Sequence, residues 1–136
     1  KKMQYKGIEE KVVAAIRRCG AERWAVVQSF NDSVLRNVHE IAPDIRLQKL
    51  IFCRLPFRLA FDGTVTKFNY EKYDYVEAVN VNFRFASKSM IRKAHAAGKK
   101  VGVWTVRTPG QVERRLSSGD VDERIDCVVT DSPDLF

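Results

Sequence analysis

Residues 87–106, which read SKSMIRKAHAAGKKVGVWTV, combine the signals of a helix with those of the strand that follows it. Ser87 is a favourable N-cap, and apolar side chains recur on one face of the segment Lys88–Ala97. Gly98 then suits the left-handed conformation with which many helices end. The apolar run Val101–Val106 is typical of a buried strand. The stretch therefore predicts a helix beside a strand, which is the repeating unit of an α/β fold.

Helices and strands alternate along the rest of the chain. Apolar spacing, N-cap residues and terminating Gly or Pro predict four helices. The first lies between Gly7 and Gly20, and the second begins at an Asn31 or Asp32 cap and ends at Pro43. The third covers Lys88–Ala97, and the fourth begins at the capping pair Thr108 and Gln111 and ends at Gly119. Short apolar runs predict strands at Trp24–Val27, Ile45–Phe52, Tyr75–Asn82, Val101–Val106 and Ile125–Thr130. Residues 53–74 are less regular. Because the strands lack an alternation of polar and apolar residues, they indicate a parallel sheet covered by helices.

Composition excludes several classes of protein. The 136 residues are 45% hydrophobic and 30% charged, which excludes a disordered tail, a collagen-like repeat and a disulfide-rich miniature scaffold. The three cysteines lie far apart, so they support neither a zinc site nor a disulfide framework. The apolar runs are too short to span a membrane. The chain begins without Met and without a leader pattern, so we expect it to belong to something longer, and the compartment stays open between periplasmic or secreted and cytoplasmic.

The net charge of +7 favours an anionic partner. However, the basic residues are scattered along the chain as pairs, such as Lys99-Lys100 and Arg114-Arg115. The sequence also has no RNA-binding aromatic signature, zinc finger or basic zipper. We therefore expect a solvated basic surface and no nucleic-acid partner.

Two α/β architectures compete for this pattern. A doubly wound nucleotide-binding sheet normally carries a glycine-rich first turn, and neither G-x-G-x-x-G nor G-x-x-x-x-G-K occurs here. Polar and aromatic residues instead follow the predicted strands, as in Ser29-Phe30-Asn31 and Asn82-Phe83. Such residues line the mouth of a (β/α)8 barrel, which typically needs about 250 residues. The chain is therefore expected to encode a little over half of a barrel.

Four stretches also resemble one protein family, and they occur in that family's order: Val26–Phe30 followed by a helix and Ile41-Ala42-Pro43, Met90–Val101, Val103–Val106, and Val128–Leu135. The family is that of the glycerophosphodiester phosphodiesterases. The first stretch resembles its fourth β-α unit, the second the helix before its seventh strand, and the third the signature of that strand. The last resembles its closing I-T-D-x-P-D-L. The match runs almost from end to end and is weakest between residues 53 and 74.

This resemblance implies that residues 1–136 form the C-terminal portion of one parallel (β/α)8 TIM-type barrel, with roughly the last five strands and no internal boundary. The family hydrolyses glycerol-phospho-alcohol diesters to glycerol 3-phosphate and an alcohol, assisted by a divalent metal such as Ca²⁺ or Mg²⁺. Its two catalytic histidines, in H-R-G and H-D motifs, and its metal-binding carboxylates precede the matching region. This chain has no such motif. The resemblance therefore implies catalytic residues and metal ligands upstream of Lys1, and an inactive chain on its own.

The two histidines of the chain are expected to have structural roles. His39 follows Val38 but lies away from the apolar stripe of its predicted helix, so we expect it to be solvated. His95 lies in the last turn before Gly98, where a cation interacts favourably with helix carbonyls. The acidic residues near strand ends, Asp32, Asp131 and Asp134, are explained by capping or turn roles.

Five residues at or just beyond the predicted strand ends are candidates for substrate binding: Ser29, Phe30, Asn82, Trp104 and Arg107. Phe30 and Trp104 would pack against the glycerol carbons, although packing inside the barrel explains them equally well. Arg107 would donate two N–H groups to a phosphate. Alternation places Trp104 opposite Arg107 along a regular strand, so both face the mouth only if the strand ends before residue 107. The family commonly has Asn at the position of Arg107.

A second interpretation stays open, in which the chain is a non-catalytic α/β module that binds a phosphorylated ligand or a protein partner. The upstream sequence would distinguish the two. For the enzyme, the expected partners are a small-molecule phosphodiester and the missing N-terminal half of the barrel. Because an isolated half-barrel leaves strand edges unpaired near residues 24 and 125, we expect this chain alone to dimerise, swap or aggregate, which sedimentation would test.

Overall fold

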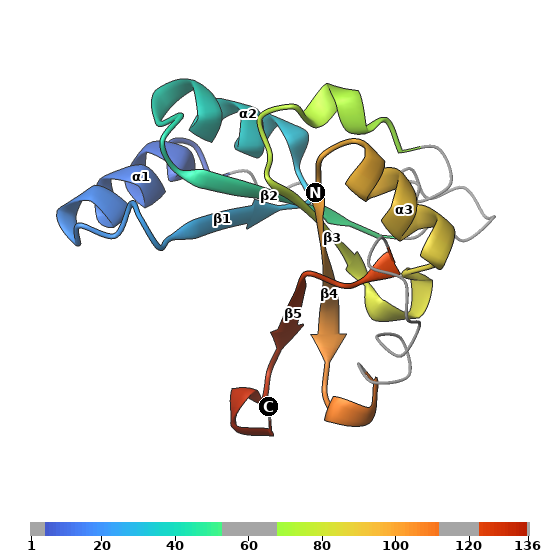
Figure 1. Cartoon of the computed structure of the whole chain (residues 1–136). Helices are drawn as coiled ribbons and strands as arrows, with labels where there is room; N and C mark the ends of the chain where they lie inside the picture. Colours follow the sequence, from blue (N-terminus) through green and yellow to red (C-terminus); the bar gives the residue numbers. More distant parts are fainter. Residues whose placement is uncertain (1–4, 53–67, 112–122, 136) are drawn as a thin grey trace.

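Five parallel strands form one curled sheet in the part of the chain that the computed structural model describes, residues 5–52, 68–111 and 123–135 (Figure 1). Their order in the sheet is their order in the sequence: β1 (Val26–Ser29), β2 (Arg46–Ile51), β3 (Ala78–Asn82), β4 (Lys100–Val106) and β5 (Cys127–Thr130). Each strand pairs in parallel with the next one along the chain. This sequential order gives an open, curled half-barrel.

Helices connect the strands. The α-helices are α1 (Ile8–Arg18), α2 (Asp32–Ile41) and α3 (Lys88–Ala96), and the short 3-10 helices are η1 (Tyr70–Tyr73), η2 (Phe83–Phe85) and η4 (Pro133–Leu135). No helix among the described residues has the length and apolar character needed to cross a membrane.

Local signals in the sequence explain where the helices begin and end. The Ser87 side chain accepts a hydrogen bond from the backbone N–H of Met90, as its predicted role as N-cap of α3 requires. Asn31, rather than Asp32, is the N-cap of α2, because its side chain accepts from the N–H of Ser33. Gly98 adopts a φ of 70° just after α3, which confirms the predicted helix end.

Two apolar clusters fill the space between the sheet and the helices. Leu47 and Ile51 lie on the same face of β2, because side chains alternate along a strand. Leu47 packs in one cluster with residues of α1 and α2, including Leu35. Ile51 packs in the other with residues of α3, including Met90. All three helices therefore cover one face of the sheet, which we call the convex face, and burying each such side chain contributes about 2 kcal/mol.

The opposite, concave face carries a layer of polar and small side chains. Gln48 Oε1 accepts hydrogen bonds from Gln28 Nε2 at 2.8 Å and from Asn80 Nδ2 at 2.7 Å. Asn80 is fully buried, and Gly102 of β4 is its neighbour in register. Cys127 of β5 comes next in register. The hydrogen bonds thus join β1, β2 and β3 on the inside of the curl, and Cys127 Sγ of β5 lies 3.9 Å from Asn80 Oδ1.

Several predicted boundaries need correction. Trp24 is not part of β1 but lies two residues before it and is 71% exposed. Tyr75 and Ile125 likewise precede β3 and β5 rather than beginning them. The predicted helix after Pro109 does begin, over residues 109–111, but its continuation lies outside the described residues. The irregular segment predicted over 53–74 is described only from Phe68 onward.

Gly102 provides a test of the concave layer. A Cβ atom at this position would lie 2.1 Å from Asn80 Oδ1 and 2.6 Å from Cys127 Sγ. We expect Gly102→Ala to lower the free energy of unfolding by about 1–3 kcal/mol in urea titrations, because Asn80 must leave its position. Gly110→Ala is the matched control, since its added carbon meets nothing within 4 Å. Equal losses of stability in the two variants would contradict the proposed crowding.

Candidate functional site

The carboxyl ends of the parallel strands lie at one edge of the half-barrel, which we call the mouth. Phe30 directly follows β1 and Phe52 follows β2, while Asn82 ends β3 and Trp104 lies in β4. By alternation these four residues continue the concave rows that contain Gln28, Gln48, Asn80 and Gly102. The curl of the sheet therefore collects them on the inner side of the mouth.

Three aromatic side chains meet there. The ring centroids of Phe30 and Trp104 lie 5.5 Å apart in an edge-to-face arrangement, and those of Phe52 and Trp104 lie 5.9 Å apart. Trp104 Nε1 donates a hydrogen bond to the carbonyl of Asn80 at 3.0 Å, which fixes the indole ring. Phe30 and Phe52 remain 43% and 42% exposed. The three rings form an apolar wall that is open to solvent.

Phe52 was missing from the sequence-based candidates. It stood at the end of the predicted strand Ile45–Phe52 and was interpreted only as part of that strand. The alternation Gln48, Leu50, Phe52 would have placed it on the concave face, if the direction in which Gln48 faces had been known. That direction follows from the pairing of Gln48 with Gln28, which a single sequence does not contain.

Ser29 and Asn82 stabilise the turns that carry the wall. Ser29 Oγ accepts a hydrogen bond from the N–H of Asn31 at 3.0 Å, and alternation puts Ser29 on the face opposite to Phe30. Asn82 Oδ1 accepts from the N–H of Arg84 at 3.1 Å and thereby caps η2. Both side chains bond to the backbone of their own turns, at the places where β1 and β3 end.

Arg107 is exposed and lies just beyond the last residue of β4. Its backbone N–H donates to Gln111 Oε1 at 2.8 Å, and the N–H of Thr108 shares this acceptor at 3.4 Å. The side chain of Gln111 thus reaches back as the predicted capping pair requires. Because β4 ends at Val106, the alternation that opposed Trp104 to Arg107 no longer applies at residue 107.

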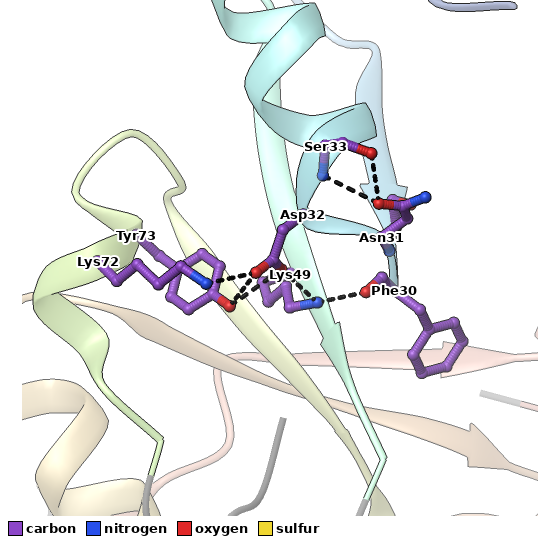
Figure 2. Close-up of polar contacts among 8 residues, drawn as sticks. Phe30, Asn31, Asp32, Ser33, Lys49, Lys72 and Tyr73 are labelled. Carbon is purple, nitrogen blue, oxygen red and sulfur yellow. Dashed lines mark hydrogen bonds and ion pairs between the residues drawn. The ribbon is translucent and has the colours of Figure 1, made fainter. Parts of the chain in front are cut away.

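A buried ionic network lies behind the mouth, on the convex side (Figure 2). Asp32 forms ion pairs with Lys49 at 2.9 Å and with Lys72 at 2.7 Å. The hydroxyl of Tyr73 donates to both oxygens of the same carboxylate, at 2.9 and 2.8 Å. The interpretation of Asp32 as a helix-capping residue was therefore wrong, since its carboxylate joins α2 to β2 and η1.

The surroundings of Asp32 change its pKa in two opposite directions. Burial on its own would raise the pKa of the carboxyl group. The hydrogen bonds from Lys72, Lys49 and Tyr73, together with the charge of Lys49, outweigh this effect and hold the pKa of Asp32 below its ordinary value. The carboxylate is therefore ionised, and it compensates the buried charge of Lys49.

Both histidines lie on helices, and each packs against a partner. The His39 ring of α2 is half-buried and stacks on Tyr75 with centroids 5.1 Å apart, a contact that the prediction of a solvated side chain did not include. His95 Nε2 lies 2.8 Å from Asp126 Oδ2, an oxygen that also accepts the N–H of Val101. These contacts connect each helix with the segment before a strand.

The described residues do not assemble a metal site. Within residues 5–52, 68–111 and 123–135, no three His, Cys, Asp or Glu side chains come close enough together to hold a metal ion. Asp131 and Asp134, which follow β5, belong to no such group. The Ca²⁺ or Mg²⁺ that the resemblance implies therefore finds no ligand set among these residues.

The chain is similar to known phosphodiesterases. Residues 1–135 match the model of the Glycerophosphoryl diester phosphodiesterase family. The chain is 28% identical to a glycerophosphodiester phosphodiesterase of Caldanaerobacter subterraneus subsp. tengcongensis, over 97% of this chain and 49% of that protein. The chain thus spans about half the length of this curated relative.

Solved structures give the same result. One is a crystal structure of a glycerophosphoryl diester phosphodiesterase from Silicibacter pomeroyi DSS-3. The likeness covers 90% of this chain and 39% of that protein, at a TM-score of 0.71 and 25% identity. A phosphodiesterase of Oleispira antarctica, solved with the product sn-glycerol-3-phosphate, matches 95% of this chain with 49% of its own, at a TM-score of 0.64 and 18% identity. These likenesses confirm the predicted fold, part of a TIM-type barrel.

The pKa of Asp32 makes a prediction about stability and pH. Because this pKa is lower in the folded chain than its ordinary value of 3.8, ionisation of Asp32 stabilises the fold above that pH. The stabilisation is lost as the pH falls through the lower folded pKa. Urea titrations of the complete barrel should therefore show the free energy of unfolding of the parent protein falling more steeply below about pH 5 than that of its Asp32→Asn variant.

At neutral pH, Asp32→Asn should also lower the free energy of unfolding by about 3 kcal/mol, because the charge of Lys49 is then buried without its partner. Asp44→Asn is the control. Asp44 pairs with Arg17 at 3.4 Å, and both side chains are about half exposed, at 54% and 52%, so this pair should contribute little. If Asp44→Asn and Asp32→Asn have the same pH profile, the network around Asp32 does not have the assigned role.

Proposed function

Because the chain belongs to the glycerophosphoryl diester phosphodiesterase family, we propose that residues 1–136 form the C-terminal portion of one phosphodiesterase barrel. The complete barrel hydrolyses glycerol-phospho-alcohol diesters to glycerol 3-phosphate and an alcohol. The observation that carries this proposal is the family match over residues 1–135 of a chain whose five strands form an open parallel curl. The coverage of only 49% of the Caldanaerobacter relative supports a further half that supplies the other strands.

The role of this chain is to form one wall of the substrate pocket. Phe30, Phe52 and Trp104 present exposed aromatic surface at the mouth, which suits the carbon atoms of a glycerol group. Arg107, exposed just beyond β4, binds a phosphate oxygen through its guanidinium N–H groups. Ser29 and Asn82 stabilise the turns at the ends of β1 and β3, and in this way they hold the wall in the position that binds the substrate.

The chemistry requires groups from the completing half. In hydrolysis, water attacks phosphorus, the bond from phosphorus to the alcohol oxygen breaks, and the alcohol leaves with a proton. This needs an acid, a base and neutralisation of charge on the phosphoryl oxygens. His39 and His95 lie on different helices. The ring of His39 stacks on Tyr75, and His95 is hydrogen-bonded to Asp126. We therefore assign the acid, the base and the ligands for Ca²⁺ or Mg²⁺ to the completing half.

Hydrolysis of glycerophosphocholine tests the assignment. The complete barrel should release glycerol 3-phosphate when Ca²⁺ or Mg²⁺ is added, and residues 1–136 alone should show no turnover. In the complete barrel, Phe30→Leu should raise KM about tenfold with a smaller change in kcat, because it removes part of the binding wall. Trp24→Leu is the control, since Trp24 is an exposed aromatic residue before the amino end of β1.

Two outcomes would change the conclusion. Metal-dependent turnover by residues 1–136 alone that survives His39→Ala and His95→Ala would contradict the assignment of the chemistry to the completing half. A complete barrel that binds glycerol 3-phosphate but shows no turnover with either metal would instead favour a non-catalytic module that binds phosphorylated ligands.

A further inference from the structure

A lysine lies within the apolar core. Lys49 stands between Leu47 and Ile51 on the convex face of β2, and its side chain is 0% exposed. A buried ammonium group is costly unless it is paired and hydrogen-bonded, and an apolar residue would fill the same space more cheaply. The presence of Lys49 in this strand therefore calls for an explanation in terms of its contacts.

Lys49 contacts Phe30, a residue of the mouth. Its ammonium group pairs with Asp32 and donates a hydrogen bond to the backbone carbonyl of Phe30 (Figure 2). Lys72 and Tyr73 complete the environment of Asp32 on its other side. One buried cation thus holds two points of the segment that links β1 to α2.

Local hydrogen bonds also stabilise this segment, from Ser29 to Ser33. The N–H of Asn31 donates to Ser29 Oγ, and Asn31 Oδ1 accepts from both the N–H and the hydroxyl of Ser33. These bonds are local, whereas Lys49 brings a bond from the neighbouring strand. Figure 2 shows the phenyl ring of Phe30 pointing away from Lys49. The Phe30 carbonyl therefore faces Lys49, while the phenyl ring packs edge-to-face on Trp104.

We propose that Lys49 is a positioning residue for substrate binding, which holds the Phe30 carbonyl so that the phenyl ring stays against Trp104 in the binding wall. This inference rests on the proposed function. An apolar residue at position 49 would leave the Phe30 carbonyl without this donor and the carboxylate of Asp32 without its buried counter-ion. The core would remain filled, but the turn would lose its link to β2.

The first part of the test is spectroscopic and needs no substrate. The test uses the complete barrel. Residues 1–136 contain two tryptophans, so a Trp24→Phe background leaves Trp104 as the reporter from this part of the barrel. In this background, Phe30→Leu should change the near-UV circular dichroism of Trp104, because the edge-to-face contact is lost. Lys49→Met should reproduce that change, and so should the double variant Asp32→Asn/Lys49→Met. The double variant removes both charges together, so it carries the test if the single variant does not fold.

Lys99→Met is the matched control. Lys99 also donates to main-chain carbonyls, those of Asp74 at 3.1 Å and Val76 at 2.9 Å, but at the amino end of β3. The Trp104 spectrum should be unchanged in this variant. The positioning role is refuted if the double variant keeps the parent spectrum while Phe30→Leu loses it.

The second part measures glycerophosphocholine hydrolysis by the complete barrel. The double variant should raise KM by about the same factor as Phe30→Leu, roughly tenfold, and Lys99→Met should leave it unchanged. If the Trp104 spectrum changes as expected but the parent barrel hydrolyses no diester, the proposed function fails while the positioning role stands. If the parent barrel is active and the double variant keeps the parent KM, the role of Lys49 in substrate binding is wrong.

Discussion

The alternation of side chains along parallel strands in fixed register is the constraint on which this structure depends. In β2 it sends Leu47, Lys49 and Ile51 to the convex face and Gln48 to the concave face. A shift of one residue would exchange these sets, exposing the buried lysine on the open face and placing an amide in the apolar core. The register therefore determines the core, the polar layer and the mouth at the same time.

The ionic contacts follow the same division between the two faces. Lys49 and Asp32 are buried together behind the sheet, where loss of either partner leaves an uncompensated charge. Glu123, also buried, pairs with Lys88 and Arg92 of α3 and thereby holds the segment before β5 on that helix. In both places a carboxylate joins segments that are distant in sequence. The pair of Asp32 with Lys49 is buried on both sides, whereas Lys88 and Arg92 are 62% and 57% exposed, so their pairs with Glu123 should contribute less.

The elements that follow local rules could be predicted from the sequence. The Ser87 cap, the Gly98 stop and the five apolar runs contain their own signals, and the ordered family motifs identified the barrel. Contacts between distant segments could not be predicted. The role of Lys49 within its predicted strand could not be found from the sequence, because its partners, the carbonyl of Phe30 after β1 and the carboxylate of Asp32 in α2, belong to other segments. His39 looked solvated because its stacking partner, Tyr75, lies beyond the next strand.

The separation of charge from the mouth also explains how this half suits the proposed substrate. A glycerophosphodiester has a glycerol group, whose C–H surface can pack on aromatic rings, and an anionic phosphate, which needs positive charge or hydrogen-bond donors. Here the strand ends present aromatic rings on the concave side, while the carboxylate of Asp32 is held behind the sheet by Lys49 and Tyr73. A carboxylate on the concave side would repel the phosphate. By neutralising Asp32 on the convex side, the network keeps its negative charge away from the aromatic wall, and Arg107, just beyond β4, is the cation that we assign to the phosphate.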